Sequence, residues 1–385
     1  MDYTAYFDNA ATTFPKPEEV YVFTDRFYRE YGVNVGRGQH KLAARAAALV
    51  AETRGLLLEL CHGPNKSVVF THTATEALNT IIRGSEWRDG MNVYVSPFEH
   101  NSVTRTLHHL GKSYAFKVFD LAFDKDTSTY DIGTIKEQFL LAKPNMVIVS
   151  HASNVCGIVA PILEIGKLAK VYGAITIFDM CQTIGLVDTD LGSDAVDFAV
   201  FAGHKTLYSP FGVAGFISKP SILLNPLIFG GTGVDSASLE LPEMVPERYE
   251  AASPNIQAIA GLNASLHWIK KTGIENIFYK EQSNREQLVA LLSQYDNIQI
   301  VPQGDSEKFI GVVSCVFDGY GSDNIGQILS DKNIAVRTGL HCAPTAHKFL
   351  GTFPSGTVRF SVSYFNNDDD FALLEDALSY IHENS

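Results

Sequence analysis

Two segments, ITIFDMCQ at residues 175–182 and FAVFAGHK at residues 198–205, decide the expected fold. Each begins with a short apolar run typical of a buried strand and ends in polar side chains, among them Asp179 and Lys205. Parallel sheets bind ligands at the carboxyl ends of their strands. We therefore expect both side chains in one crevice, where a lysine in apolar surroundings can act as an amine nucleophile.

Each of the two residues, taken alone, also has a structural interpretation. A single Asp after a strand is commonly a helix cap or part of an ion pair, and most single lysines have no catalytic role. A buried carboxylate is costly unless a cation meets it. Because two successive strands deliver Asp179 and Lys205 to the same edge, the pair favours the catalytic interpretation.

The regions around these segments alternate between strand and helix patterns. Helices are predicted at residues 41–60, 75–82, 102–110 and 161–171, and strands at residues 68–70, 92–95, 146–150, 175–179, 198–201 and 213–217. Such alternation predicts an α/β fold in which helices cover both faces of a mostly parallel sheet.

After about residue 250 the pattern changes. Helices are predicted at residues 256–271, 283–294, 322–330 and 368–382, and strands at residues 298–301 and 312–317. We expect a large domain at residues 21–250 and a smaller α+β domain at residues 251–385. The N-terminal segment, residues 1–20, is expected to pack on the smaller domain.

Composition excludes several classes of protein. Of 385 residues, 45% are apolar and 19% are charged, which is typical of a chain with a large core. A net charge of −13 argues against nucleic-acid binding. There is no secretory signal and no apolar stretch approaching a membrane span, so we expect no membrane association. Five scattered cysteines without a CxxC pair predict reduced thiols and a cytoplasmic location.

Two segments have the composition of anion sites. Thr73-Ala74-Thr75-Glu76 follows a predicted strand and opens a helix, so its backbone N–H groups and hydroxyls would face a phosphate. The turn GGTG at residues 230–233 is a second candidate. The chain has no Walker sequence and no GxGxxG, so nucleotide binding is not supported.

Cys342 is the candidate reactive thiol. It lies in RTGLHCAP at residues 337–344, where Arg337, His341 and the nearby His347 would favour a thiolate. The other four cysteines are interpreted as small buried residues. A metal site at His341, Cys342 and His347 has no familiar ligand spacing, so we expect no metal. Downstream, Arg359 in a strand-like run could clamp a carboxylate or form a structural ion pair.

Several segments, in order along nearly the whole chain, resemble the cysteine desulfurase group of class V enzymes. They are DNAATT (8–13), NVGRGQH (34–40), TATEALN (73–79), FEHNS (98–102), SNVCG (153–157), FDMCQ (178–182), FAGHK (201–205), GGTG (230–233) and RTGLHCAP (337–344). The short RTGxHCA stretch resembles the SUF-type and selenocysteine-lyase-like branch. The resemblance implies fold type I of the transferases that depend on pyridoxal 5'-phosphate (PLP).

The resemblance also implies a role for each matching residue. Contacts to the cofactor would come from Lys205 (covalent), Asp179 (pyridine nitrogen), His100 (ring stacking), Gln182 (ring oxygen), and Ala74, Thr75 and His204 (phosphate). Asn154 and Arg359 would hold the substrate carboxylate. Ser253 and Gly231 of the GGTG turn would reach the phosphate in a partner subunit, which implies a homodimer with shared active sites.

The implied reaction converts L-cysteine to L-alanine, with Lys205, His100 and Cys342 as catalytic residues. Sulfur would be taken up as a persulfide on Cys342 and passed to a thiol or to an acceptor protein. The alternatives are a selenocysteine lyase, a cysteine-sulfinate desulfinase, a class V aminotransferase or epimerase, and an inactive scaffold or sulfur-carrier partner. The chain departs from the family pattern at Ala202, at Ala252-Ser253 and at Leu340, where relatives have Ser, Gly-Thr and His.

Overall fold

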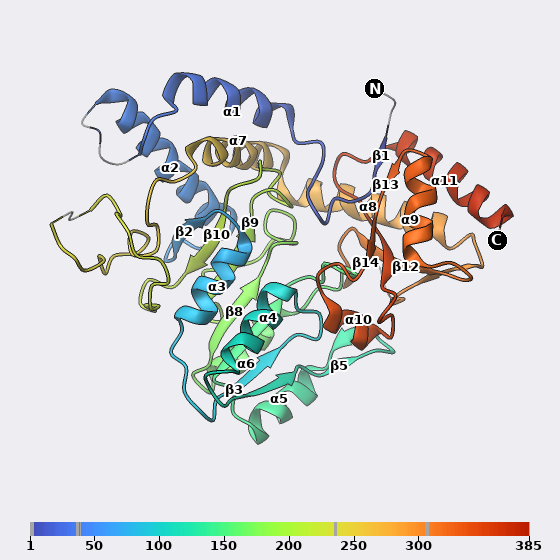
Figure 1. The fold of residues 1–385 in the computed structure, drawn as a ribbon, viewed down its shortest axis with the longest axis horizontal. Coiled ribbons are helices and arrows are strands. Elements are labelled where there is room, and N and C mark those ends of the chain that lie inside the picture. The colour runs from blue at the N-terminus through green and yellow to red at the C-terminus, as the bar shows by residue number, and fades with distance from the viewer. Residues whose placement is uncertain (1–3, 36–37, 39, 235–236, 305–307, 385) are drawn as a thin grey trace.

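The computed structural model describes residues 4–35, 38, 40–234, 237–304 and 308–384 (Figure 1). Part of the NVGRGQH segment, residues 36, 37 and 39, lies outside the described residues. Among the described residues, no helix is both long and apolar enough to cross a membrane.

A mixed sheet forms the larger unit. In the described residues its strand order is β2 (Ser67–Thr71), β10 (Ala214–Ser218), β9 (Phe198–Ala202), β8 (Ile175–Asp179), β7 (Met146–Ser150), β3 (Asn92–Val95) and β4 (Lys117–Asp120). Only β10 runs antiparallel to its neighbours. The predicted α/β fold with a mostly parallel sheet is confirmed.

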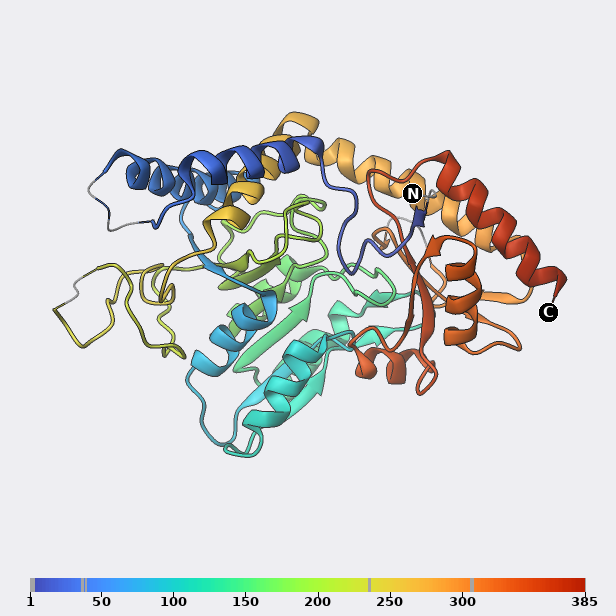
Figure 2. The same cartoon turned by 45° about the horizontal axis from the view of Figure 1, so that its top comes forward.

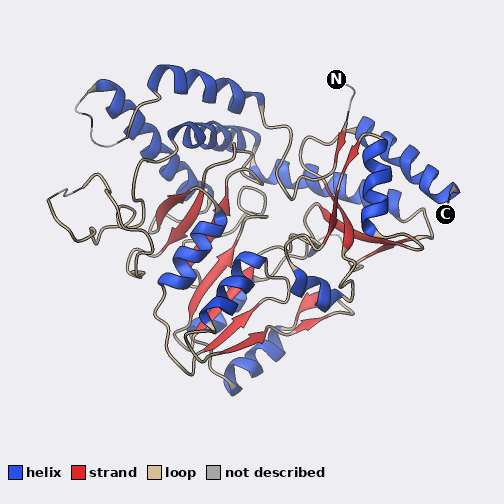
Figure 3. Ribbon diagram, viewed as in Figure 1, coloured by secondary structure: helices blue, strands red, loops and turns tan. Residues whose placement is uncertain are grey.

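Helices cover both faces of this sheet, because side chains alternate along each strand. In β9, Ala199 and Phe201 join one core cluster, whereas Phe198 and Val200 join another. The first cluster lies under α2 (Lys41–Leu60), α5 (Ile132–Leu141), α6 (Ile162–Lys170) and α7 (Ile256–Thr272). The second lies under α3 (Ala74–Gly84) and α4 (Asn101–Leu110). Figure 3 shows the strands enclosed between these helices.

A smaller antiparallel sheet stands beside the large one. Its order is β11 (Ile298–Ile300), β12 (Val312–Phe317), β15 (Thr357–Ser361) and β14 (Arg337–Gly339). Its core includes side chains of α8 (Ile274–Leu292), α9 (Ser322–Asp331) and α11 (Asp368–Glu383). The hairpin strands β5 (Phe123–Asp124) and β6 (Thr129–Tyr130) and helix α10 (Pro344–Leu350) lie near where the two units meet (Figure 1).

The N-terminal segment contacts both units. Strand β1 (Ala5–Tyr6) pairs in parallel with β13 (Ile334–Ala335) of the smaller unit. A few residues later, Thr13 N donates to the carbonyl of His204, which follows β9 in the larger unit. The segment therefore crosses the space between the two sheets.

Helix α7 packs with the larger unit. It runs beside α1 (Glu18–Tyr31) in both views (Figures 1 and 2), and its apolar side chains share a core cluster with those of α2. We propose that the boundary between the units lies near Gly273, between α7 and α8, instead of at residue 250. Helix α8 begins at Ile274, nine residues before the predicted start at residue 283.

Candidate active site

Eight of the candidate residues line one cavity at the carboxyl ends of β7, β8 and β9. They are Ala74, Thr75, His100, Asn154, Asp179, Gln182, His204 and Lys205. The two segments that decide the fold therefore place their polar ends in the same cavity, as expected for parallel neighbours.

Lys205 is positioned by a tight turn after β9. Gly203 N donates to Val213 O on the neighbouring chain segment, and a Cβ atom on Gly203 would lie only 2.7 Å from that oxygen. A larger residue would therefore push the turn away from β10. On the other side, Thr13 Oγ1 donates to the backbone carbonyl of Lys205 at 2.9 Å. The backbone of Lys205 is thus held from both sides, while its side chain lines the cavity.

Asp179 ends β8, opposite Ser150 of β7. Its Oδ1 accepts a hydrogen bond from Cys181 N at 3.0 Å, and the buried carboxylate lines the cavity with Lys205. A buried carboxylate needs compensation. A protonated ring nitrogen placed against it would provide that compensation.

His100 is the N-cap residue of α4. Its Nδ1 accepts a hydrogen bond from Ser102 N at 3.1 Å, which fixes the ring at the cavity wall. Burial lowers the pKa of His100, although the nearby Asp179 carboxylate opposes this effect. The imidazole is therefore favoured in its neutral form, with the Nε2 atom free to carry the proton.

The first turn of α3 and the ring of His204 line one end of the cavity, where the sequence predicts a phosphate. Thr73 caps α3 by accepting from Glu76 N, and the N–H groups of Ala74 and Thr75 belong to the unpaired first turn. Among the described residues, His204 Nδ1 is buried without a hydrogen-bond partner. Burial, together with Lys205 and Lys16, lowers the pKa of His204 to about 3. A phosphate group fits this end, because it would supply the missing acceptor.

Gln182 and Asn154 line the cavity, but their amide nitrogens already have protein partners. Gln182 Nε2 donates to Ala10 O at 2.9 Å, and Asn154 Nδ2 donates to His341 O at 2.8 Å. Each amide nitrogen has a second N–H, so the roles predicted for them, hydrogen bonds to a ring oxygen and a substrate carboxylate, do not require the loss of these bonds.

Arg359 lies behind the cavity wall. Its Nη1 donates to Asn154 O at 2.9 Å, and its Nη2 forms an ion pair with Asp8 Oδ1 at 2.6 Å. The guanidinium is almost fully buried. The structural ion pair that the sequence left open as an alternative is therefore present.

Cys342 is exposed and lies outside the set of residues that line the cavity. Arg337 Nη2 is 3.6 Å from its Sγ, and Cys342 O accepts from Asn101 N, next to His100. Both His341 and Cys342 have positive φ, 45° and 57°, a strained region for residues other than glycine. The strained turn that carries the thiol is thus tied through the Cys342 carbonyl to the residue that follows His100.

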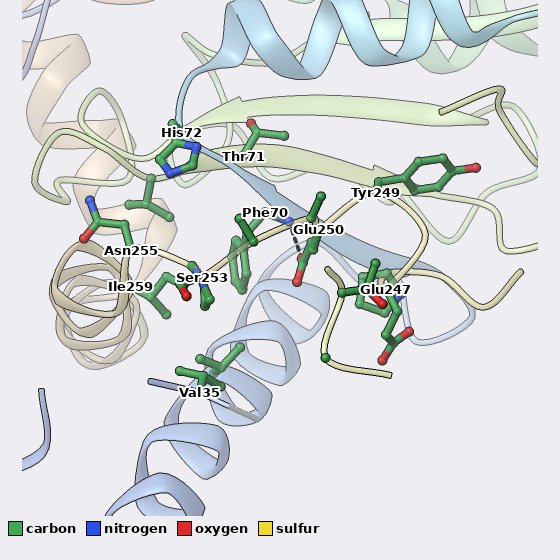
Figure 4. A pocket seen from close by; sticks show the side chains of 18 of the residues that line it. Val35, Phe70, Thr71, His72, Glu247, Tyr249, Glu250, Ser253, Asn255 and Ile259 are labelled. Carbon is green, nitrogen blue, oxygen red and sulfur yellow. Dashed lines mark hydrogen bonds between the residues drawn. The ribbon is translucent and has the colours of Figure 1, made fainter. Parts of the chain in front are cut away.

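Ser253 and Gly231 lie away from this cavity. Ser253 lines a second cavity with Thr232 and Gly233 (Figure 4). Gly231 O accepts from Ala252 N at 2.8 Å. Ala252 stands where relatives have Gly and has a φ of 73°, so this departure places a side chain in a region that favours glycine. Of the other departures, Ala202 lines the first cavity, and nothing in the structure explains Leu340.

No metal cluster is found in the described part of the chain, where no group of three or more His, Cys, Asp or Glu side chains is arranged to bind an ion. The rings of His341 and His347 lie 5.4 Å apart, and burial lowers the pKa of each.

The sequence pattern missed two charged groups near the cavity. Asp8 pairs with Arg359, and Lys16 Nζ donates to His204 O at 2.7 Å, where burial lowers the pKa of Lys16 to about 7. Both lie in or just after the DNAATT segment. The only signal was the resemblance of that segment to a family motif.

The mixed sheet and the lysine and aspartate at its strand ends define the fold as type I of the PLP-dependent transferases. The model of one family, aminotransferase class V, matches residues 5–374. The chain belongs to the class V aminotransferase family, whose members are PLP enzymes. The predicted fold type and family are confirmed.

The similar proteins are described as cysteine desulfurases or probable cysteine desulfurases. A probable cysteine desulfurase from Methanothermobacter thermautotrophicus is 31% identical over 382 residues, which cover 98% of this chain and 94% of that protein. A cysteine desulfurase from Haloferax volcanii is 29% identical, covering 98% of this chain and 89% of that protein. The apo structure of a cysteine desulfurase from Thermococcus onnurineus NA1 superposes with a TM-score of 0.92 at 28% identity, over 99% of this chain and 95% of that one.

Proposed function

We propose that this protein is a PLP-dependent cysteine desulfurase that converts L-cysteine to L-alanine and takes up the sulfur on Cys342. The observation that carries the proposal is one cavity lined by Asp179, His100 and Lys205, with an exposed cysteine whose backbone is bonded to the residue after His100. The names of the relatives support the same activity.

Different cavity residues would contact different parts of PLP. Asp179 would pair with the ring nitrogen, His100 would cover the ring, and Ala74, Thr75 and His204 would hold the phosphate. Bound in this way, PLP supplies an aldehyde that captures amines and a ring that withdraws electrons from the substrate Cα. The Lys205 amine would capture the aldehyde in the resting enzyme.

Two side chains carry out the reaction steps. Lys205 Nζ would remove the Cα proton of the substrate. The Cys342 thiolate then attacks the substrate sulfur, so that an S–S bond forms as the C–S bond breaks. The C–S electron pair stays with the carbon side, Cβ gains a proton, Lys205 returns a proton to Cα, and the product leaves as alanine. The sulfur remains as a persulfide on Cys342, at the surface, where an acceptor can reach it.

We further propose a homodimer with shared active sites. The loop between β10 and α7 projects from the body of the molecule (Figure 2) and exposes Ile228, Phe229, Leu239 and Met244. The same loop carries Gly231 and leads to Ser253. A second copy of the chain would cover these apolar side chains and bring both residues to its own phosphate site. The five free thiols support a cytoplasmic location, and the exposed persulfide site suits an acceptor protein.

A selenocysteine lyase is the second candidate, because Cys342 does not line the cavity. Selenium is the better leaving group, so that reaction would not depend on the thiol.

The test is to incubate the purified protein with L-cysteine and a reductant and to measure alanine and sulfide together. We expect equal amounts of the two products, lost in Cys342→Ser while the absorption band of bound PLP is retained. Full turnover of L-cysteine by Cys342→Ser would contradict the covalent role. Turnover of selenocysteine alone, unchanged in Cys342→Ser, would establish the lyase instead.

A further inference from the structure

The guanidinium proposed to receive the substrate carboxylate already holds a carboxylate of the protein. Arg359 Nη2 and Asp8 Oδ1 lie 2.6 Å apart. The Arg359 side chain is 2% exposed, whereas the Asp8 side chain is 22% exposed. Asp8 is therefore the accessible half of the pair, and a ligand arriving from solvent meets Asp8 before it meets Arg359.

The guanidinium is nevertheless adjacent to the cavity. Arg359 Nη1 donates to the backbone carbonyl of Asn154, whose side chain lines the cavity that holds Lys205. A carboxylate in this part of the cavity can thus reach the guanidinium if the anion that covers it moves aside.

The backbone around Asp8 is fixed, so only its side chain can move away from Arg359. Tyr6 Oη donates to Asp8 O at 3.2 Å, and residue 8 forms a parallel bridge with Ser361. Farther along, Gln182 Nε2 binds Ala10 O. The Asp8 carboxylate, in contrast, is partly exposed and can turn towards solvent without breaking these backbone contacts.

Charge balance requires that one anion replace another. Burial lowers the pKa of Arg359, and the Asp8 carboxylate opposes that effect by stabilising the cation. Removing one partner of a buried ion pair leaves an uncompensated charge, which is strongly unfavourable. Two carboxylates against one guanidinium would repel each other. A ligand with a carboxylate can therefore displace Asp8 at little cost, whereas a ligand without one cannot.

We infer that Asp8 is a positioning residue whose carboxylate occupies Arg359 in the resting enzyme and is displaced by the carboxylate of the substrate. This inference rests on the proposed function, in which the substrate is a free amino acid. It makes Asp8 a determinant of specificity, because amides and peptide-linked residues lack the anion that opens the pair.

The test is a calorimetric titration of the PLP-loaded enzyme with L-alanine and, separately, with L-alaninamide, which lacks the carboxylate. In Asp8→Asn the competing charge is gone while the side chain keeps its shape. We expect the dissociation constant for L-alanine to fall about tenfold, within the range of coupling energies for close charge pairs. The constant for L-alaninamide should change less than about twofold. Asp25→Asn, which removes an exposed carboxylate paired with Arg29, is the matched control and should change neither constant.

Three outcomes would overturn the inference or its basis, and they can be told apart. If Asp8→Asn binds both ligands equally more weakly, or binds them as the wild type does, the Asp8–Arg359 ion pair is only structural. Asp8→Ser, which is smaller, repeats the measurement if Asp8→Asn fails to fold, and its melting temperature reports folding independently. If Arg359→Lys binds L-alanine as tightly as the wild type, the carboxylate site of the proposed function is wrong. If L-alanine binds more weakly to Arg359→Lys but no more tightly to Asp8→Asn, Arg359 still binds the carboxylate and only the displacement of Asp8 is wrong.

Discussion

The floor of the cavity and the segment that carries Cys342 are held in opposite ways. Asp179 and Lys205 follow the ends of fully or largely buried strands, in a sheet packed on both faces. Cys342 is exposed on a turn between β14 and α10, where two consecutive residues have positive φ. One region is fixed by its core, and the other by a few hydrogen bonds that hold a strained backbone in place.

This difference matches the two parts of the proposed reaction. Groups that must keep one geometry towards a bound ring are placed most reliably by strand ends. A thiol that must meet a substrate and then an acceptor needs access to solvent. The larger unit would therefore provide a fixed geometry, and the Cys342 segment would provide access.

The most severe test of this division is Lys205→Ala. Removing the amine should lower alanine production by about 10⁴-fold, the upper range for proton transfer by a positioned side chain. Because the backbone of Lys205 is held by its own hydrogen bonds, the melting temperature should change little. Alanine assays and thermal unfolding measure the two effects.

Lys167→Ala, on the exposed side of α6, is the matched control and should retain full activity. Appreciable turnover by Lys205→Ala would mean that another group removes the proton, and the fixed region would lose its catalytic role.

The stability of the protein should depend on pH through Glu281 of α8. Its Oε1 accepts from Gly311 N at 2.9 Å, and burial raises the pKa of Glu281 from 4.5 to about 8. The unfolded chain releases this proton near pH 4.5 and the folded protein near pH 8, so stability contributed by the protonated group is lost as pH rises through this window. Glu281→Gln keeps the acceptor but does not titrate.

We expect the stability of Glu281→Gln relative to wild type to grow between pH 5 and pH 8. The increase should be roughly 2 kcal/mol or more, because each tenfold difference in proton affinity contributes about 1.4 kcal/mol. Denaturant unfolding at several pH values measures it, with Glu164→Gln on the surface of α6 as the control. A relative stability independent of pH would show that Glu281 is ionised in the folded protein.

The smallest expected effect compares two cysteines. Cys315 on β12 is fully buried in the core of the smaller unit. Cys315→Ser should lower the free energy of unfolding by about 1–3 kcal/mol, since a hydroxyl enters an apolar core. Activity per folded molecule should remain. Cys342→Ser, in contrast, should lose activity but keep its free energy of unfolding within about 0.5 kcal/mol of the wild-type value.

Chemical denaturation and alanine assays on both variants give the comparison directly. A stability loss in Cys342→Ser as large as that in Cys315→Ser would mean that the Cys342 turn belongs to the core after all.

The sequence predicted best where burial and polarity change sharply. Strands such as β7 and β8 match the predictions to the residue, because a fully apolar run ends in polar groups. Helix α1 was missed because only Val20 and Phe27 are buried on it. The early start of α8 was missed because its first turns bury the polar Glu281 among few apolar side chains.

The site was predictable in its residues but not in their partners. The cavity follows from local strand ends, so Asp179, His100 and Lys205 could be named. The Asp8–Arg359 pair joins residues 351 positions apart, and no local pattern encodes it. The carbonyl partners of Gln182 and Asn154 likewise depend on the final packing of distant segments.

The path of the N-terminal segment has a consequence for how the protein is made. The first residues bind Lys205 through Thr13 and bind strand β15 through Asn9, whose Nδ2 donates to Ser361 O. A chain emerging from the ribosome carries the first half of this junction long before the second half exists. The Thr13 partner is available once residue 205 has been synthesised, but Asn9 has no partner on β15 until residue 361 has been synthesised. The junction beside the active site is thus completed only after residue 361 has been added, so chains that end before it cannot close the junction.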